Sequence, residues 1–415
     1  MQIDALRRID RYLGIPLCWG LSLTRRTYTW IRGKPVLPKP RKVLVIKLSE
    51  MGSTVLACPA LAELKQRYPD SDLYFLVFAK NAAIMEVLKL APAENIITVD
   101  YRTPWELLRS GSKAMLRLFR ERFDTAIDMD LFSRLTALIS FIVCRGNRVG
   151  FHRYNDEGLY RGDLLTHRVL YSPHIHTSAA FSSLVKSLFQ TLDDEPYYRG
   201  PVNPRELTVP PYQPEAADVA SVRHKLNAAG IDPDSRMIVL INPNSSDIFP
   251  LRKWPLKYYA QLCCQVLEKI PQCALVITGV ASEKEDARYL LEQVHGPRCV
   301  DFTGKTSFRE LLALYSLAAV MVTNDSGPAH FASLLRLPTV ILFGPETPRL
   351  YSPIGDKHKD MYSNFACSPC VSVYNGKKSP CRENRCLIAI SPEAVFEAVL
   401  ASLDDARAMN CRIIP

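Results

Sequence analysis

The chain has 415 residues, a formal net charge of +10 and 47% hydrophobic residues. This length exceeds one ordinary hydrophobic core and predicts two domains of ~150–200 residues. No stretch approaches the ~20 apolar residues of a membrane-spanning helix, so the composition indicates a globular protein.

The first segment of the chain holds most of the net charge. Residues 1–42 carry +8 and the remaining residues only +2. Thirteen uncharged residues, many of them apolar, lie between Arg11 and Arg25. This run ends in Arg25-Arg26 instead of the small residues of a signal-peptide cleavage site. The pattern favours a segment that lies on an anionic membrane surface. The alternative is a basic arm packed on the protein's own surface.

The first half predicts βαβ units and therefore a parallel sheet. Helical patterns cover 58–68 and 82–90. The predicted strands are 42–47, 73–78, 95–100, 125–129 and 148–151.

The Pro-rich stretch 201–214 is the best candidate for a linker, after which the pattern restarts. Strands are predicted at 237–241, 274–278, 300–302, 320–323 and 339–343, with helices at 258–268, 283–294 and 308–318. We therefore expect three parts: a basic amphipathic extension (1–41) and two Rossmann-like domains (42–205 and 206–415). Two such domains facing each other form a cleft, and ligands of open α/β sheets bind beyond the carboxyl ends of the strands.

The segment Val320–His330 predicts a strand, a tight turn and a helix start. Asn324 to Pro328 supply turn and capping residues, with proline near the first helical position. Such a helix start suits a phosphate or diphosphate. The alternative is an ordinary capped turn. Other polar turns of this half also follow predicted strands, and they place Arg252, Lys253 and Lys305 at the same edge.

These turns closely resemble the second domain of glycosyltransferase family 9, the ADP-heptose:lipopolysaccharide heptosyltransferases. The family has a Lys/Arg-x-Trp-Pro turn, a Thr-Gly-Lys-Thr-Ser turn, an Asn-Asp-Ser-Gly-Pro-x-His turn and a Phe-Gly-Pro-Thr-x-Pro turn. This chain has Arg252–Pro255, Thr303–Ser307, Asn324–His330 and Phe343–Pro348 in that order.

The resemblance implies a GT-B fold and an inverting, metal-independent transfer of a sugar, expected to be heptose from ADP-heptose. The acceptor is expected to be a lipopolysaccharide core or a related cell-envelope molecule. No nucleic-acid partner is expected, and the site of action is the cytoplasm, peripherally on the inner face of the inner membrane. Glu283 falls near the acid that binds the nucleotide ribose in the family, and Glu285 is the alternative for this role. His330 could instead pack under the turn that precedes it. The expected donor-binding residues are Ser245, Ser246, Arg252, Lys253, Glu283, Lys305, Asp325, Ser326, Gly327 and His330.

The first domain departs from the family at its catalytic turn. The family's Ser-Ser-x-Gly-Asp-Val turn reads Ser49-Glu-Met-Gly-Ser-Thr-Val55 here, so Ser53 stands where the family has its proposed base, an Asp. A neutral serine hydroxyl needs a base of its own. Glu50 is the first replacement candidate and Asp128 the second, although either could be a helix cap or a solvated acid. The rival functions are a nucleotide-sugar-binding scaffold without activity and a sugar-nucleotide epimerase.

Two further clusters remain open in the sequence. Arginines after the strand with Asp128, among them Arg134, Arg148 and Arg153, suit an acidic acceptor, or else a solvated surface. Four cysteines late in the chain have the spacing of a structural zinc site, but free thiols are the favoured interpretation, with zinc and then disulfides as alternatives. They are Cys367, Cys370, Cys381 and Cys386.

Overall fold

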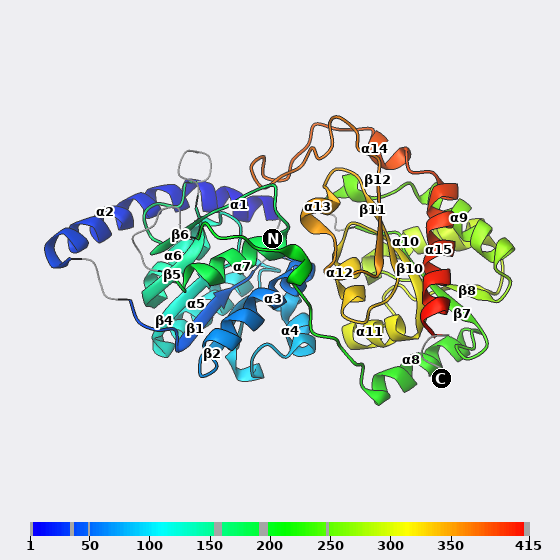
Figure 1. Cartoon of the computed structure of the whole chain (residues 1–415), viewed down its shortest axis with the longest axis horizontal. Helices are drawn as coiled ribbons and strands as arrows, with labels where there is room; N and C mark the ends of the chain where they lie inside the picture. The colour runs from blue at the N-terminus through cyan, green and yellow to red at the C-terminus, as the bar shows by residue number, and fades with distance from the viewer. Residues whose placement is uncertain are drawn as a thin grey trace. The chain divides into compact units, whose positions relative to one another are not determined.

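The computed structural model describes residues 3–33, 37–48, 50–152, 160–190, 198–245 and 249–410. It divides into two compact units, Met1–Leu207 and Thr208–Pro415. The boundary lies within the Pro-rich stretch 201–214. Each unit is a parallel six-stranded sheet with helices (Figure 1).

The sheet of the first unit has the strand order β3-β2-β1-β4-β5-β6, and all of its pairs are parallel. Its strands are β1 (Lys42–Ile46), β2 (Asp72–Phe78), β3 (Ile96–Val99), β4 (Phe123–Asp128), β5 (Cys144–His152) and β6 (His167–Leu170). Its helices after the extension are α3 (Met51–Arg67), α4 (Ala82–Leu88), α5 (Pro104–Glu121), α6 (Arg134–Val143) and α7 (Thr177–Ser187). The order reverses beside β1, which places the ends of β1 and β4 next to each other. In such sheets the reversal point is where ligands bind.

The second unit repeats this topology in the order β12-β11-β10-β7-β8-β9. Its strands are β7 (Met237–Asn242), β8 (Cys273–Ile277), β9 (Cys299–Asp301), β10 (Ala318–Asn324), β11 (Thr339–Phe343) and β12 (His358–Tyr362). Its helices are α8 (Ala216–Ala228), α9 (Leu256–Lys269), α10 (Lys284–Val294), α11 (Phe308–Leu317), α12 (Gly327–Ser333), α13 (Pro348–Tyr351), α14 (Arg385–Ile388) and α15 (Pro392–Asn410).

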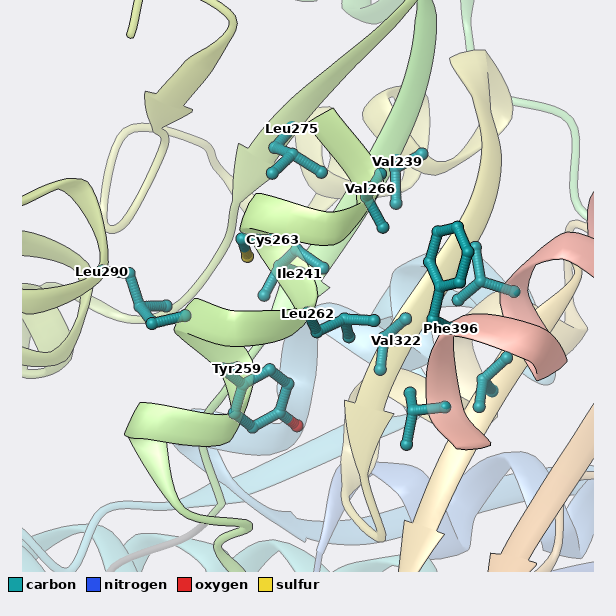
Figure 2. Close-up of a cluster of buried hydrophobic side chains, with 14 of the residues drawn as sticks. Val239, Ile241, Tyr259, Leu262, Cys263, Val266, Leu275, Leu290, Val322 and Phe396 are labelled. Atoms are coloured by element: carbon teal, nitrogen blue, oxygen red, sulfur yellow. The ribbon is translucent and has the colours of Figure 1, made fainter. Parts of the chain in front are cut away.

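One hydrophobic cluster holds this second sheet to its helices. Figure 2 shows Leu262 and Val266 of α9 against Val239 of β7 and Val322 of β10, with Phe396 of α15 beside them. These side chains are almost fully buried. The cluster packs α9 and α15 against the strands of the second sheet. The polar turns follow the carboxyl ends of these strands.

The basic extension is helical, as α1 (Ile3–Tyr12) and α2 (Gly14–Arg32). Pro16 is tolerated because it stands in the first turn of α2, where no intrahelical N–H bond is lost. One side of α2 packs on the first unit: Cys18 is completely buried with Ala137 and Leu138 of α6. The alternative of an arm packed on the protein's own surface is therefore correct for this side of the helix.

Two histidines of the first unit, the buried His167 and the half-buried His152, are expected to make its stability depend on pH. Burial, followed by the charge of Arg168, lowers the pKa of His152 to about 4. Burial, followed by the charge of Arg148, lowers the pKa of His167 to about 4. The unfolded chain has a histidine pKa of about 6.5. Between these values the unfolded state binds more protons, so acidification from pH 6.5 towards 4 destabilises the folded state.

Near pH 5 the free energy of unfolding of this unit should fall by roughly 1 kcal/mol per pH unit for each histidine. Urea denaturation at several pH values measures this slope. His167→Gln should reduce the slope, whereas His224→Gln, at an exposed position on α8 of the other unit, should leave it unchanged. An unaltered slope in His167→Gln would contradict the assignment.

Candidate active site

The carboxyl ends of β7 and β10 are joined by the side chain of Asn324. Its Nδ2 donates to the carbonyl oxygens of Pro243 (2.8 Å) and Asn244 (3.2 Å), and its Oδ1 accepts from the backbone N of Trp254 (3.0 Å). Trp254 itself is completely buried, and its Nε1 donates to the carbonyl of Ile390. The Trp-Pro turn and the turn after β10 therefore form one rigid unit.

Arg252 is held at this edge by two buried carboxylates. Its Nη2 lies 2.7 Å from Glu346 Oε1, and its Nε lies 3.5 Å from Asp325 Oδ2. Its Nη1 donates to the carbonyl of Asp325, and its guanidinium stacks on Phe249 at 4.8 Å. Lys377 adds a second cation, with Nζ 3.7 Å from Glu346. Two cations and two carboxylates are thus packed together beside the helix start of α12.

Asp325 is part of this buried cluster. Only 4% of its surface is exposed. Its backbone N donates to the carbonyl of Leu342, and its carboxylate faces Arg252. Replacement of Asp325 would therefore remove a buried partner of Arg252 and is expected to lower the stability of the second unit. Ser326 begins α12 without any side-chain hydrogen bond to the first turn. Its Oγ donates instead to the carbonyl of Asn324.

A second group of polar side chains gathers at the ends of β8 and β9. A Cβ built at Gly279 would lie 2.8 Å from both Asn244 Nδ2 and Glu283 Oε2, so a larger residue there would displace these two side chains. Glu283 accepts from the backbone N of Val280 at 2.7 Å, which fixes its carboxylate at this turn. Glu285 instead is exposed and pairs with Arg288. The structure therefore favours Glu283 over Glu285.

Buried polar atoms without partners mark the same place. Asn244 is 3% exposed and Thr303 is not exposed at all. Within the described part of the chain, neither the side-chain amide of Asn244 nor the hydroxyl of Thr303 has a hydrogen-bond partner. An unsatisfied buried polar group costs about 1–3 kcal/mol, and a bound ligand can satisfy it. The sequence analysis selected Ser245 and Ser246, next to Asn244, and the turn that begins with Thr303, but neither Asn244 nor Thr303 as a donor-binding residue.

The other expected donor residues lie less favourably. Lys253 Nζ is 3.1 Å from Asp286 of α10, and Lys305 donates to the carbonyl of Asp301 with more than half of its side chain exposed. Ser245 is buried and donates to Phe249. His330 is buried in α12. Ser246 lies outside the described residues.

Glu346 and Lys377 are two further functional candidates that the sequence analysis missed. Glu346 stands where the family pattern Phe-Gly-Pro-Thr-x-Pro has Thr, and this departure was the available signal. Its carboxylate contacts Arg252 and Lys377 while only 1% exposed. No pattern in the sequence connects Lys377 to Arg252, because the two residues are far apart in the chain.

In the first unit, Asp128 is a structural residue. Its Oδ2 accepts from Arg161 Nη2 and from Thr136 Oγ1 (2.7 Å), and its Oδ1 accepts from the backbone N of Asp130 (3.1 Å). Neither Asp128 nor Arg161 has an exposed side chain. The reading of Asp128 as a solvated acid is wrong, and a carboxylate enclosed in this way has no access to an acceptor.

Glu50 is exposed and precedes α3 in a strained conformation with φ 27°. Its carbonyl accepts from Ser53 Oγ at 2.9 Å, so the Ser53 hydroxyl is a hydrogen-bond donor within the first turn of α3. Asp130 binds the two residues that follow β1, Lys47 and Leu48. Its Oδ2 accepts from the backbone N of Leu48 (2.8 Å), and its Oδ1 lies 3.6 Å from Lys47 Nζ.

Two of the expected acceptor arginines, Arg134 and Arg148, make their contacts inside the first unit. Arg148 donates to the carbonyls of Leu164, Cys144 and Gly146, and burial lowers its pKa to about 10. This buried position is the reason why neither an acceptor role nor a solvated surface fits Arg148. Arg134 is also buried and faces Asp10 of α1 at 3.4 Å. Arg153 lies outside the described residues.

The four clustered cysteines are free thiols, with Cys367 and Cys381 exposed and Cys386 buried. Among the described residues, no group of three or more His, Cys, Asp or Glu side chains is placed to hold a metal ion. Burial raises the pKa of Cys58 and of Cys299 to about 12, as expected for unreactive core thiols.

Two parallel six-stranded units with polar turns at their carboxyl edges form the GT-B architecture. The model of glycosyltransferase family 9 (heptosyltransferase) matches residues 113–379, so the chain belongs to this family and is a glycosyltransferase. It is 26% identical over 362 residues to lipooligosaccharide heptosyltransferase 2 of Haemophilus influenzae, covering 86% of this chain and 97% of that protein.

Two solved structures have the same fold. The ADP-heptose lipopolysaccharide heptosyltransferase II of Escherichia coli has a TM-score of 0.67 at 22% identity and covers 88% of this chain and 99% of that chain. The E. coli heptosyltransferase WaaC with ADP has a TM-score of 0.62 at 16% identity and covers 87% of this chain and 99% of that chain.

Proposed function

We propose that this glycosyltransferase moves a heptose from ADP-heptose to a lipopolysaccharide core or related cell-envelope acceptor, with inversion and without a catalytic metal. The acceptor oxygen forms the new bond to the anomeric carbon while the bond to the diphosphate oxygen breaks. A carboxylate takes the acceptor proton, and the leaving ADP carries away the bonding electrons. The sugar and the nucleotide are inferred from the names of the relatives.

The observation that carries the proposal is the Arg252 cluster at the carboxyl edge of the second sheet. Arg252 matches the Lys/Arg of the family's Trp-Pro turn, and Asp325 and Glu346 fix its guanidinium in place. A guanidinium can bind phosphate oxygens with two parallel hydrogen bonds and stabilise charge on a leaving diphosphate. Asn244 and Thr303 supply further polar atoms. We therefore assign donor binding to the second unit and acceptor binding to the first.

A binding or scaffolding protein without turnover is the second candidate. It is favoured by Ser53, whose hydroxyl donates to the carbonyl of Glu50 and cannot act as a base. The first candidate therefore needs Glu50, which is exposed on the same turn.

We infer a cytoplasmic enzyme that acts peripherally at the inner membrane, because the proposed acceptor belongs to the cell envelope. The helices α1 and α2 are the part that would contact an anionic membrane. No helix within the described residues is long and apolar enough to cross a bilayer.

A donor screen tests the function directly. Among ADP-, GDP-, UDP- and CMP-sugars, the ADP-sugar should give the largest rise in melting temperature, because a ligand at 100 times its Kd stabilises by about 2.7 kcal/mol. Mass spectrometry after incubation with a heptose-deficient core acceptor should then show one added heptose. A changed sugar nucleotide with an unchanged acceptor would indicate an epimerase, and binding with no product a scaffold.

A further inference from the structure

The outer side of α2 is an exposed apolar face with no partner among the described residues. Trp19, Leu23 and Trp30 follow one another at helical spacing, and Trp30 is 87% exposed. Tyr12, before the start of α2, is 70% exposed as well. Globular proteins rarely leave several large apolar side chains together in water unless they bind something.

The opposite side of α2 is firmly attached to the first unit. Gly14 and Cys18 are small residues that allow close approach: a Cβ at Gly14 would lie 2.7 Å from the side chain of Arg134. Ser22 accepts from the backbone N of Asp163, and Arg25 pairs with Asp163 at 2.8 Å. Because one side is held in this way, the apolar side is fixed outward.

On α1 and α2 several positive charges are exposed to solvent, whereas the carboxylate of Asp10 faces the first unit. Arg8, Arg11, Arg26 and Arg32 are exposed. The carboxylate of Asp10 instead points to α6, where it accepts from the backbone N of Leu135 at 2.8 Å. The outward surface is therefore apolar and cationic, and its exposed charges would repel a second copy of the same surface.

We propose that this face of α1 and α2, with Trp19, Leu23, Trp30 and the exposed arginines, binds in the plane of an anionic lipid bilayer. Tryptophan favours the membrane–water interface, and each arginine near an anionic surface adds attraction that salt screens. The extension is thus a rigid lipid-binding platform of the first unit.

The platform also reaches the proposed acceptor side of the protein. Asp10 holds the first turn of α6, which begins shortly after the end of β4. The use of the platform to present a membrane-bound acceptor rests on the proposed function, but lipid binding itself does not.

The test is vesicle flotation of the full-length protein with phosphatidylcholine alone and with added phosphatidylglycerol. We expect binding only to the anionic vesicles. Replacing Trp19, Leu23 and Trp30 by serine should weaken this binding at least tenfold. A second variant replaces the exposed arginines by glutamine and should also bind at least tenfold more weakly, since each basic residue adds attraction to an anionic surface. The replaced arginines are Arg8, Arg11, Arg26 and Arg32. Trp105→Ser with Leu108→Ser, an equally exposed pair on α5, is the matched control and should bind normally.

Truncation of the extension is unsuitable, because it would uncover Leu138 and Leu164 and remove Asp10 from α6. Melting curves of the substituted proteins should match the wild type, since these side chains contact water. Turnover of a soluble acceptor fragment should also stay unchanged, which separates lipid binding from catalysis. Equal flotation of all variants would overturn the proposal. The proposal would also be overturned if the wild-type protein did not bind vesicles but formed a dimer, and the serine variant were a monomer.

Discussion

Arg252→Met is expected to lower kcat/KM by about 100- to 1,000-fold, the usual cost of removing one group that stabilises charge developing in a transition state. The guanidinium is already oriented by Asp325 and Glu346 and by stacking on Phe249. It therefore needs little reorganisation when the diphosphate leaves. The effect should appear both in the affinity for ADP, measured by calorimetry, and in turnover.

Arg252→Lys should retain part of the activity, because the family pattern accepts Lys or Arg and the positive charge remains. It cannot reproduce the two-pronged geometry, so an intermediate rate is expected. The matched control is the neighbouring Lys253→Met, whose ammonium faces Asp286 on α10. Lys253→Met should leave ADP affinity unchanged.

Stability must be measured alongside activity. Loss of one partner from a buried ion pair costs about 3–5 kcal/mol, although Lys377 still faces Glu346 in this variant. A folded Arg252→Met protein with wild-type ADP affinity and rate would show that the donor site lies elsewhere.

The alternation of strands and helices was predictable because buried parallel strands have continuous apolar sequences, as in Met237–Asn242. The strands β6 and β12 were missed. Both are edge strands whose sequences, such as His358–Tyr362, contain few apolar residues. Helix α2 was recognised only as an apolar run, because the small residues of its packing side, Cys18 and Ser22, interrupt the usual pattern.

The location of the candidate site was predictable for a topological reason. The carboxyl ends of parallel strands meet at one edge, so turns far apart in sequence, such as those at Arg252 and Asp325, had to lie together. The roles of charged side chains were less predictable. Asp128 and Arg148 are buried by partners that the local sequence does not reveal, Arg161 for the first and backbone carbonyls for the second.

Glu50→Gln is expected to reduce turnover by about 100- to 10,000-fold with little change in ADP affinity, which is the usual cost of losing a general base. Glu50 lies between β1 and α3 and is the exposed carboxylate nearest in sequence to Ser53. A carboxylate in its ionised form can take the acceptor's proton as a general base. Glutamine keeps the size of the side chain but cannot take up this proton.

Asp128→Asn distinguishes a catalytic carboxylate from a structural one. It removes the charge that balances the fully buried Arg161, so its melting temperature should fall together with its activity. Glu50→Gln, at an exposed position, should melt like the wild type. A Glu50→Gln enzyme with normal turnover would exclude Glu50 as the base.

Ser53→Asp completes the test, because it restores the carboxylate of the family pattern in the first turn of α3, where the helix dipole favours a negative charge. If Glu50 is the base, Ser53→Asp should rescue the Glu50→Gln variant at least in part. If Ser53→Asp alone raises a rate that Glu50→Gln leaves unchanged, the native protein is a weakened transferase or a binding protein. Steady-state rates of Glu50→Gln, Ser53→Asp and the double variant, measured on the same donor and acceptor, decide between a transferase and a binding protein.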